Sequence, residues 1–178
     1  AWCAVLRPAA MPKSLVEKAA KGWNPKLQKW KPPATLNIRD LINDLDFAVA
    51  NGEEVHVVKM YRYLLEPNCL ATVVDDVVAS GAISRFVDFL LRDDAWELQY
   101  ESAWAITNVA AGSREHTTAA AAAVPNLVRL LQSYRDVEDV PVNTACTTRD
   151  ADNVATQAMW ALANIAGDGR ELRDRVLD

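Results

Sequence analysis

Two pairs of residues are suited to recognition chemistry, and each is a Trp followed four positions later by an Asn: Trp104 with Asn108, and Trp160 with Asn164. An Asn side chain carries a donor and an acceptor, so it can bond to both the N–H and the C=O of an extended peptide. The face of a Trp can hold the aliphatic stem of a Lys or Arg, with a cation–π attraction of about 0.5–2 kcal/mol. Two such pairs in register therefore predict a ladder that binds an extended, basic peptide.

A structural interpretation of the same pairs is the alternative. Both Trp side chains would then pack between neighbouring helices, and both Asn side chains would satisfy backbone groups. Spacing favours the ladder, because packed helices stand about 8–10 Å apart and an extended chain advances about 3.3 Å per residue. One Trp–Asn pair would thus serve about every third residue of the ligand.

Helical periodicity predicts that these pairs lie outside the core. In the helix expected over 97–111, small and apolar residues form the inward stripe: Leu98, Ser102, Ala105, Ile106 and Val109. In the helix expected over 154–166 the corresponding stripe is Val154, Ala158, Ala161, Leu162 and Ile165. Glu101 and Gln157 fall on the outer face with the Trp–Asn pairs.

Internal repetition predicts the architecture. Residues 81–90 match residues 122–131 at a shift of 41, whereas the two Trp–Asn helices match at a shift of 56. The excess is assigned to the polar segment 134–150, interpreted as a loop insertion. A period near 41 with one short and two longer helices is in the armadillo and HEAT range, and strand-like alternation is nowhere sustained. We predict an all-α, right-handed armadillo solenoid of about two to three repeats with a concave face.

The chain divides by composition into a lead and a body. Residues 1–36 hold five of the eight prolines, and residues 1–31 hold seven Lys or Arg against one acid, whereas the remainder holds twelve against twenty-three. We expect a basic, flexible lead over 1–36 and the armadillo array over 37–178, with early helices over 37–51, 55–65 and 70–79. The lead either folds back onto the acidic body as a weak competitor or stays a solvated tail.

Composition excludes several classes of protein. The chain of 178 residues is 51% hydrophobic and 24% charged with a net charge of −5, which argues against an electrostatic nucleic-acid binder, and no segment reaches transmembrane length. No nucleophile–base set, phosphate loop or metal-ligand spacing is visible, and His56 and His116 stand alone. We expect no enzyme, no cofactor, no metal, and neither nucleic acid nor membrane as a partner.

The residues around both Trp–Asn pairs carry a family resemblance. Residues 98–108, LQYESAWAITN, and residues 157–169, QAMWALANIAGDG, resemble importin α, the armadillo adaptor that carries proteins with basic nuclear localisation signals into the nucleus. The resemblance implies cargo proteins with Lys/Arg-rich signals as partners, and a location in cytoplasm and nucleus. It also implies that Trp104, Asn108, Trp160 and Asn164 line the major signal-binding groove.

The same resemblance implies a pocket for one lysine of the ligand. Its oxygens would come from the backbone of Gly112, the hydroxyl of Thr117 and the carboxylate of Asp168, and Gln157 matches a polar position lining the groove. An ammonium has three donors, so three oxygens would satisfy it.

The chain also departs from the family. Ala111 stands where members commonly carry Ser, and the lead lacks the arginine-rich helix by which importin α engages importin β, which leaves that partner open. The start at Ala1 and the end at Asp178 within a helical pattern suggest a fragment or a shortened product. Two alternatives therefore stay open: a general armadillo scaffold for another extended partner, and a truncated regulatory fragment unable to recruit importin β.

Overall fold

The computed structural model describes residues 23–24, 29–30, 41, 45, 48–49, 52–66, 71–135 and 148–178. The chain divides into two compact units, Ala1–Leu36 and Asn37–Asp178. The described part of the first unit is a pair of two-residue strands, β1 (Trp23–Asn24) and β2 (Lys29–Trp30), which pair antiparallel with Trp23 opposite Trp30.

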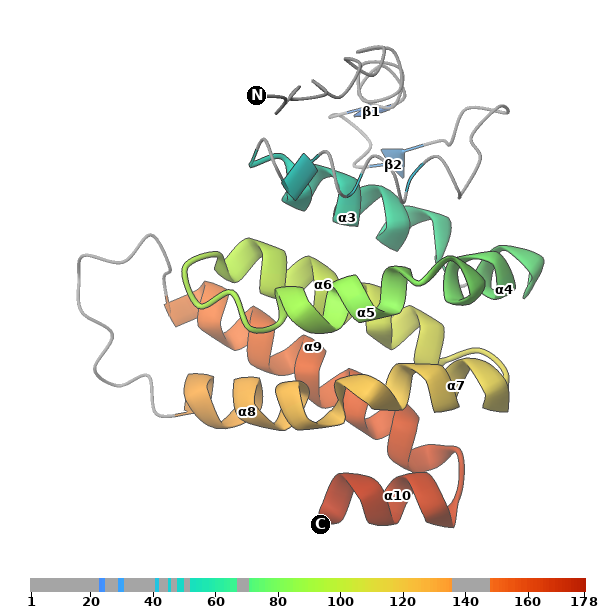
Figure 1. Ribbon diagram of the computed structural model, residues 1–178. Coiled ribbons are helices and arrows are strands. Elements are labelled where there is room, and N and C mark those ends of the chain that lie inside the picture. Colours follow the sequence, from blue (N-terminus) through green and yellow to red (C-terminus); the bar gives the residue numbers. More distant parts are fainter. Residues whose placement is uncertain are drawn as a thin grey trace, which may run out of the picture. The chain divides into compact units, whose positions relative to one another are not determined.

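Every described element of the second unit is helical (Figure 1). The elements in chain order are α3 (Glu54–Leu64), α4 (Ala71–Ser80), α5 (Ala82–Phe89), α6 (Trp96–Ala110), α7 (Arg114–Ala120), the 3-10 turn η1 (Ala121–Ala123), α8 (Val124–Arg135), α9 (Thr148–Gly167) and α10 (Arg170–Leu177). The predicted all-α armadillo solenoid is confirmed.

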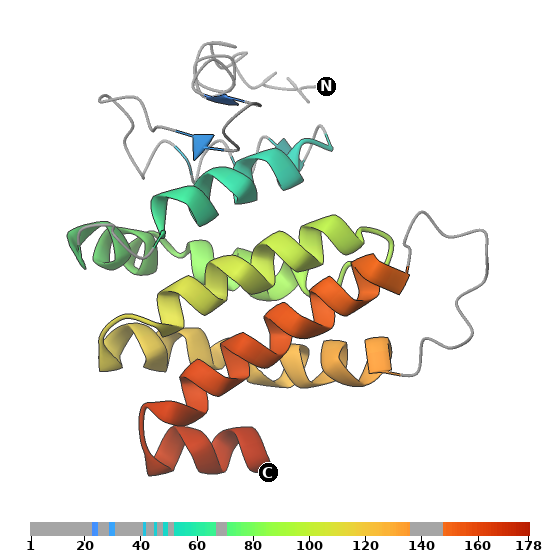
Figure 2. The same cartoon turned by 180° about the vertical axis from the view of Figure 1, so that it is seen from behind.

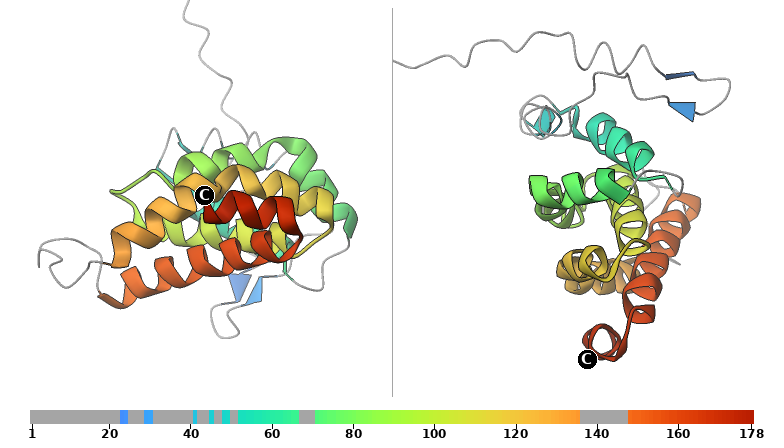
Figure 3. Two further views of the ribbon diagram at one scale, coloured as in Figure 1. Left: turned by 90° about the horizontal axis from the view of Figure 1, so that it is seen from below. Right: turned by 90° about the vertical axis from the view of Figure 1, so that its right-hand side faces the viewer.

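The helices of the second unit form two layers. Helices α3, α6 and α9 make one layer, and α4, α5, α7 and α8 make the other (Figure 3, right). Seen from behind, α6 and α9 lie side by side across the face of the first layer (Figure 2). The two Trp–Asn helices are therefore neighbours, as a ladder requires.

The two repeats differ in the turn before their second helix, which is α5 in the first repeat and α8 in the second. Gly81 joins α4 to α5 in the left-handed conformation, with φ of 86°, which glycine adopts without steric cost. At the shift of 41 its equivalent is Ala122, for which that conformation is unfavourable. The chain instead passes through η1 into α8, and Pro125 lies in the first turn of α8, where a missing N–H breaks no helical bond.

The core lies between the two layers. Its large, fully buried side chains come from both: Tyr61, Phe86, Leu90, Leu98, Ile106, Leu127, Leu130 and Ile165. The rings of Tyr61 and Phe86 meet edge to face with centroids 5.3 Å apart, a favourable aromatic geometry. Apolar burial between helices thus holds successive repeats together. Within the described ranges, no helix combines the length and the hydropathy needed to cross a membrane.

Part of the predicted loop insertion is helical. Residues 134–135 end α8 and residues 148–150 begin α9. No Gly or Pro lies between Leu131 and Pro141, so nothing in the sequence stops α8 at residue 133. Residues 136–147, most of the helix predicted over 37–51, and the flexibility and fold-back predicted for the lead lie outside the described residues. Leu41, Leu45, Ala48 and Val49 of that helix are described and are helical.

Candidate peptide-binding face

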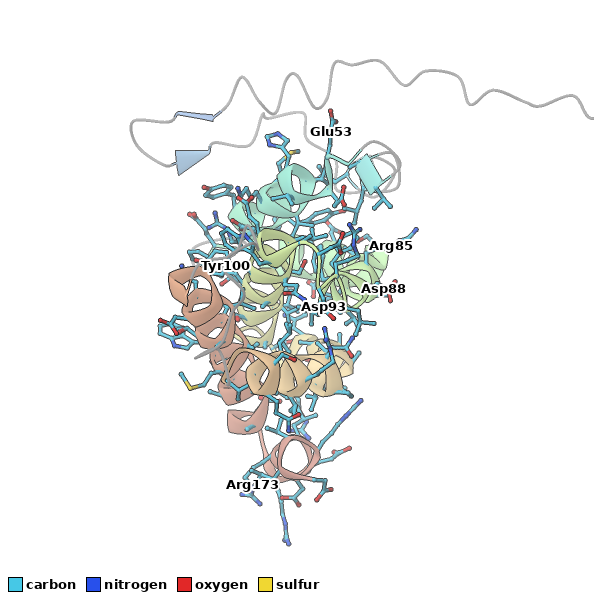
Figure 4. All side chains as sticks on the ribbon, turned by 90° about the vertical axis from the view of Figure 1, so that its left-hand side faces the viewer. Glu53, Arg85, Asp88, Asp93, Tyr100 and Arg173 are labelled. Carbon is cyan, nitrogen blue, oxygen red and sulfur yellow. The ribbon has the colours of Figure 1, made fainter. Side chains whose placement is uncertain are left out.

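The inward stripes predicted for α6 and α9 are buried in the structure. All ten residues named for the two stripes lie in the core or are buried. This burial fixes the rotation of each helix about its axis, so Trp104, Asn108, Trp160 and Asn164 lie outside the stripe. Figure 4 shows Tyr100 of α6 on one side of the helical layers and Arg85 and Asp88 of α5 on the opposite side.

Both Asn side chains make the same kind of bond to the preceding repeat. Asn108 Nδ2 donates to the backbone oxygen of Arg62 in α3 at 3.4 Å, and Asn164 Nδ2 donates to the backbone oxygen of Thr107 in α6 at 3.1 Å. One N–H of each amide is therefore used within the fold. The second N–H and the amide oxygen of each Asn, which are both half-buried residues, are what the side chain can offer to a ligand.

The two Trp side chains differ in their surroundings. Trp104 is half-buried, with the guanidinium carbon of Arg62 4.2 Å from its ring centroid and the Tyr100 ring edge-on at 5.6 Å. Trp160 is 59% exposed. The α3 side of the ladder thus already contains a cation stacked on an aromatic ring, whereas Trp160 presents an open ring.

Arg62 is a residue that the sequence analysis missed. Its side chain is buried and its Nε donates to Glu101 Oε2 at 2.6 Å, while Lys59 pairs with Glu97 at 2.5 Å. Helical spacing on α6 gave no signal for it, because Arg62 belongs to another helix. The sequence showed a basic residue at position 62 in the helix expected over 55–65, but nothing that paired it with α6.

Glu101 corrects one expectation. Helical phase placed it on the outer face with the Trp–Asn pairs, but it is only 4% exposed and its carboxyl group faces Arg62. The reason is that α3 covers this part of α6. Glu101 is therefore enclosed in the contact between α3 and α6 and is not an open acidic contact for a ligand.

Burial raises the pKa of Glu101, and the nearby Arg62 opposes that shift. The folded protein therefore keeps a proton on Glu101 at pH values where the unfolded chain has lost it. A raised carboxyl pKa adds stability that is fully present below the ordinary value of 4.5 and is lost as the pH rises through the folded value.

We expect Glu101→Gln, which mimics the protonated acid, to remove this pH dependence. Relative to the wild type, the free energy of unfolding of the variant should be lowest near pH 4 and increase toward neutrality, because only the wild type loses stability as Glu101 ionises. Urea titrations at a series of pH values measure the difference, with Glu66→Gln as an exposed control. A variant whose relative stability falls as the pH rises would contradict the assignment.

The residues implied for a lysine pocket come from the start of α7 and the end of α9. Thr117 is buried, and its hydroxyl donates within the fold to the backbone oxygens of Ala110 and Ser113, at 3.1 and 3.0 Å. Asp168 follows α9, and its Oδ2 is shielded from solvent without a hydrogen-bond partner among the described residues. Arg114 of α7 reaches the same segment, with its Nη1 2.9 Å from the backbone oxygen of Asp168.

Gly112 lies two residues before α7 and packs closely against the side chain of His116. A Cβ on Gly112 would lie 2.5 Å from Nδ1 of His116. That ring nitrogen accepts from the Ser113 N–H, while Ser113 Oγ accepts from the His116 N–H, which makes a reciprocal cap at the N-terminus of α7. His116 also contacts Asp75 Oδ1 at 2.7 Å through Nε2, so both ring nitrogens are engaged within the fold.

Gln157 lies on α9, one turn before Trp160 and half-buried. Its backbone oxygen accepts from the Thr107 hydroxyl at 3.3 Å, and its side-chain Oε1 has no hydrogen-bond partner among the described residues. Within those residues no group of three or more His, Cys, Asp or Glu is arranged to hold a metal ion.

The fold and this face define an armadillo-type helical solenoid in which the neighbouring helices α6 and α9 each carry one Trp–Asn pair. Each such pair is called a rung. No family model matches the chain. Curated relatives do match: it is 41% identical over 106 residues to Importin subunit alpha-2 of Arabidopsis thaliana, which covers 58% of this chain and 17% of the relative. It is 42% identical over 129 residues to Importin subunit alpha-1a of Oryza sativa subsp. japonica, which covers 71% of this chain and 21% of the relative.

The chain is therefore similar to importin α subunits over part of their length. It spans about a fifth of the length of the curated relatives named here.

Proposed function

We propose that the face formed by α6 and α9 binds extended peptides rich in Lys and Arg, the nuclear localisation signals, and that the chain acts as an importin α-like nuclear import adaptor. Its partners are then cargo proteins with such signals, its places of action are cytoplasm and nucleus, and its role is binding without catalysis.

The observation that carries the proposal is the matching orientation of the two rungs. Asn108 and Asn164 are each fixed by one N–H to a backbone oxygen of the preceding repeat, so their remaining polar atoms are already oriented before a ligand arrives. Orienting these groups in advance lowers the entropy cost of binding. Trp160 adds an exposed ring next to Asn164, and the carboxylate of Asp168 follows on the same helix end.

A peptide titration tests the proposal directly. The full chain is titrated by calorimetry with a synthetic peptide of five consecutive Lys residues between Gly-Ser flanks, and with the same peptide carrying Ala in place of every Lys. We expect binding of the first peptide and none of the second. Equal heats from both peptides would contradict the proposal.

We expect Asp168→Lys to weaken binding of the lysine peptide by about tenfold, because it places a cation where the ligand's cation must lie. Circular dichroism should be unchanged, since Asp168 follows the end of α9. Asp152→Lys, an exposed acid in the first half of the same helix, is the matched control and should change affinity little. An unaltered dissociation constant for Asp168→Lys would remove Asp168 from the site.

A further inference from the structure

Arg114 lies against the carboxylate that the proposed function assigns to a ligand lysine. Its Nη1 is 3.7 Å from Asp168 Oδ2 and donates to the backbone oxygen of Asp168 at 2.9 Å. Its Nη2 is 3.6 Å from Glu171 Oε2 in the first turn of α10. One guanidinium thus bridges the start of α7 and the turn between α9 and α10.

The carboxylate beside this guanidinium is not fully satisfied by it. Asp168 Oδ2 is shielded from solvent and has no hydrogen-bond partner among the described residues, because 3.7 Å exceeds hydrogen-bond distance. A buried carboxylate oxygen without a donor is costly. An ammonium group that reached this oxygen would gain a charge-assisted hydrogen bond that Arg114 does not make.

We propose that Arg114 is an internal cation that competes with the ligand's lysine for Asp168, and that it thereby sets the affinity and the lysine preference of this subsite. The inference rests on the proposed function and goes further by naming a residue that opposes binding. Arg114 repels an incoming cation and partly neutralises the carboxylate that should attract it.

The surroundings of Arg114 allow its guanidinium to give way. Its side chain is 55% exposed, so its ion pair with Asp168 is screened and weak. Glu171 is an exposed second acid within reach of Nη2, and the guanidinium can keep this partner when it leaves Asp168. Gly169 between them has no side chain, and a Cβ there would lie 3.0 Å from Nη1, so the turn provides the room that the guanidinium occupies.

A purely structural role for Arg114 predicts the opposite result. In that case the bond to the Asp168 backbone oxygen holds the end of α9 in place, and removing the side chain would misplace Asp168 and weaken binding. Arg114→Gln separates the two roles, because a Gln amide can still donate to a backbone oxygen but carries no charge. Arg170→Gln is the matched control, since Arg170 is an exposed Arg two residues after Asp168 and its loss changes the net charge equally.

The experiment measures the affinity of wild type, Arg114→Ala, Arg114→Gln and Arg170→Gln for the five-lysine peptide at 50 and 300 mM salt. We expect both Arg114 variants to bind about three- to tenfold more tightly than wild type at 50 mM salt. The gain should shrink at 300 mM, and Arg170→Gln should stay within twofold of wild type. A peptide with its five lysines replaced by norleucine should show no gain.

Three results would overturn the inference. Arg114 variants that bind equally or more weakly, while wild type still binds and discriminates lysine from alanine peptides, reject the competitor role and leave the proposed function intact. An equal gain in Arg170→Gln would make the effect one of net charge alone. If wild type and all variants fail to distinguish lysine from alanine peptides, the proposed function fails, and the inference fails with it.

Discussion

Arg62→Met should lower the free energy of unfolding by about 3–5 kcal/mol at neutral pH, the range for breaking a buried ion pair by removing one partner. Arg62 and Glu101 are both buried and joined at 2.6 Å. Met keeps most of the volume of the side chain but leaves the Glu101 carboxylate in low dielectric without its main opposing charge. The guanidinium that stacks on Trp104 is lost as well. Urea denaturation followed by circular dichroism measures the change.

Two further variants make this result specific. Arg62→Met/Glu101→Leu removes both charges and should recover most of the lost stability, because an apolar pair of similar volume replaces a buried ion pair at little cost. Arg170→Met removes an exposed arginine whose contact with Asp174 is 3.6 Å, and it should change stability by less than about 0.5 kcal/mol. If Arg62→Met and Arg170→Met have equal effects, the Arg62–Glu101 pair does not stabilise the contact between α3 and α6.

Trp160→Ala should weaken binding of the five-lysine peptide by about 1–3 kcal/mol, the range expected for an aromatic residue that dominates an interface. Trp160 is 59% exposed, so its removal leaves no cavity and should change stability little. A large loss of affinity without a loss of stability is therefore the expected pattern. Calorimetry on the folded variant measures the affinity, and the thermal midpoint checks the fold.

Met159 provides the matched control for this prediction. It precedes Trp160 on α9 and is 51% exposed, so Met159→Ala removes a comparable exposed apolar side chain without touching the rung. We expect Met159→Ala to bind as the wild type does. Trp104→Ala should lose both affinity and stability, because Arg62 and Tyr100 pack on that ring. Wild-type affinity in Trp160→Ala would exclude the Trp–Asn face as the binding site.

The two Trp side chains differ in how far they take part in the contact between repeats. At α6 the cation on the aromatic ring is the protein's own, because Arg62 stacks on Trp104. At α9 the ring of Trp160 is open. The α6 rung is thus part of the contact between repeats, as the structural interpretation of the pairs predicted, and peptide binding there stays a proposal.

The sequence by itself determined the architecture and the faces of the helices. Shifts of 41 and 56 residues predicted stacked helical repeats, and the stripe from Leu98 to Val109 predicted which side of α6 is buried. Both results depend on local periodicity, because a helix repeats every 3.6 residues and its apolar residues must leave water together. The alignment of the two Trp–Asn pairs followed from the same periodicity.

Only the tertiary structure decided which groups from other helices meet these faces. Arg62 reaches Glu101 across 39 positions and Arg114 reaches Asp168 across 54, and no spacing within one helix predicts either contact. Helical phase therefore placed Glu101 outside, whereas packing against α3 buried it. The physical reason is that periodicity sets the rotation of a helix about its own axis, while the charge that a neighbouring helix brings depends on how the two helices pack.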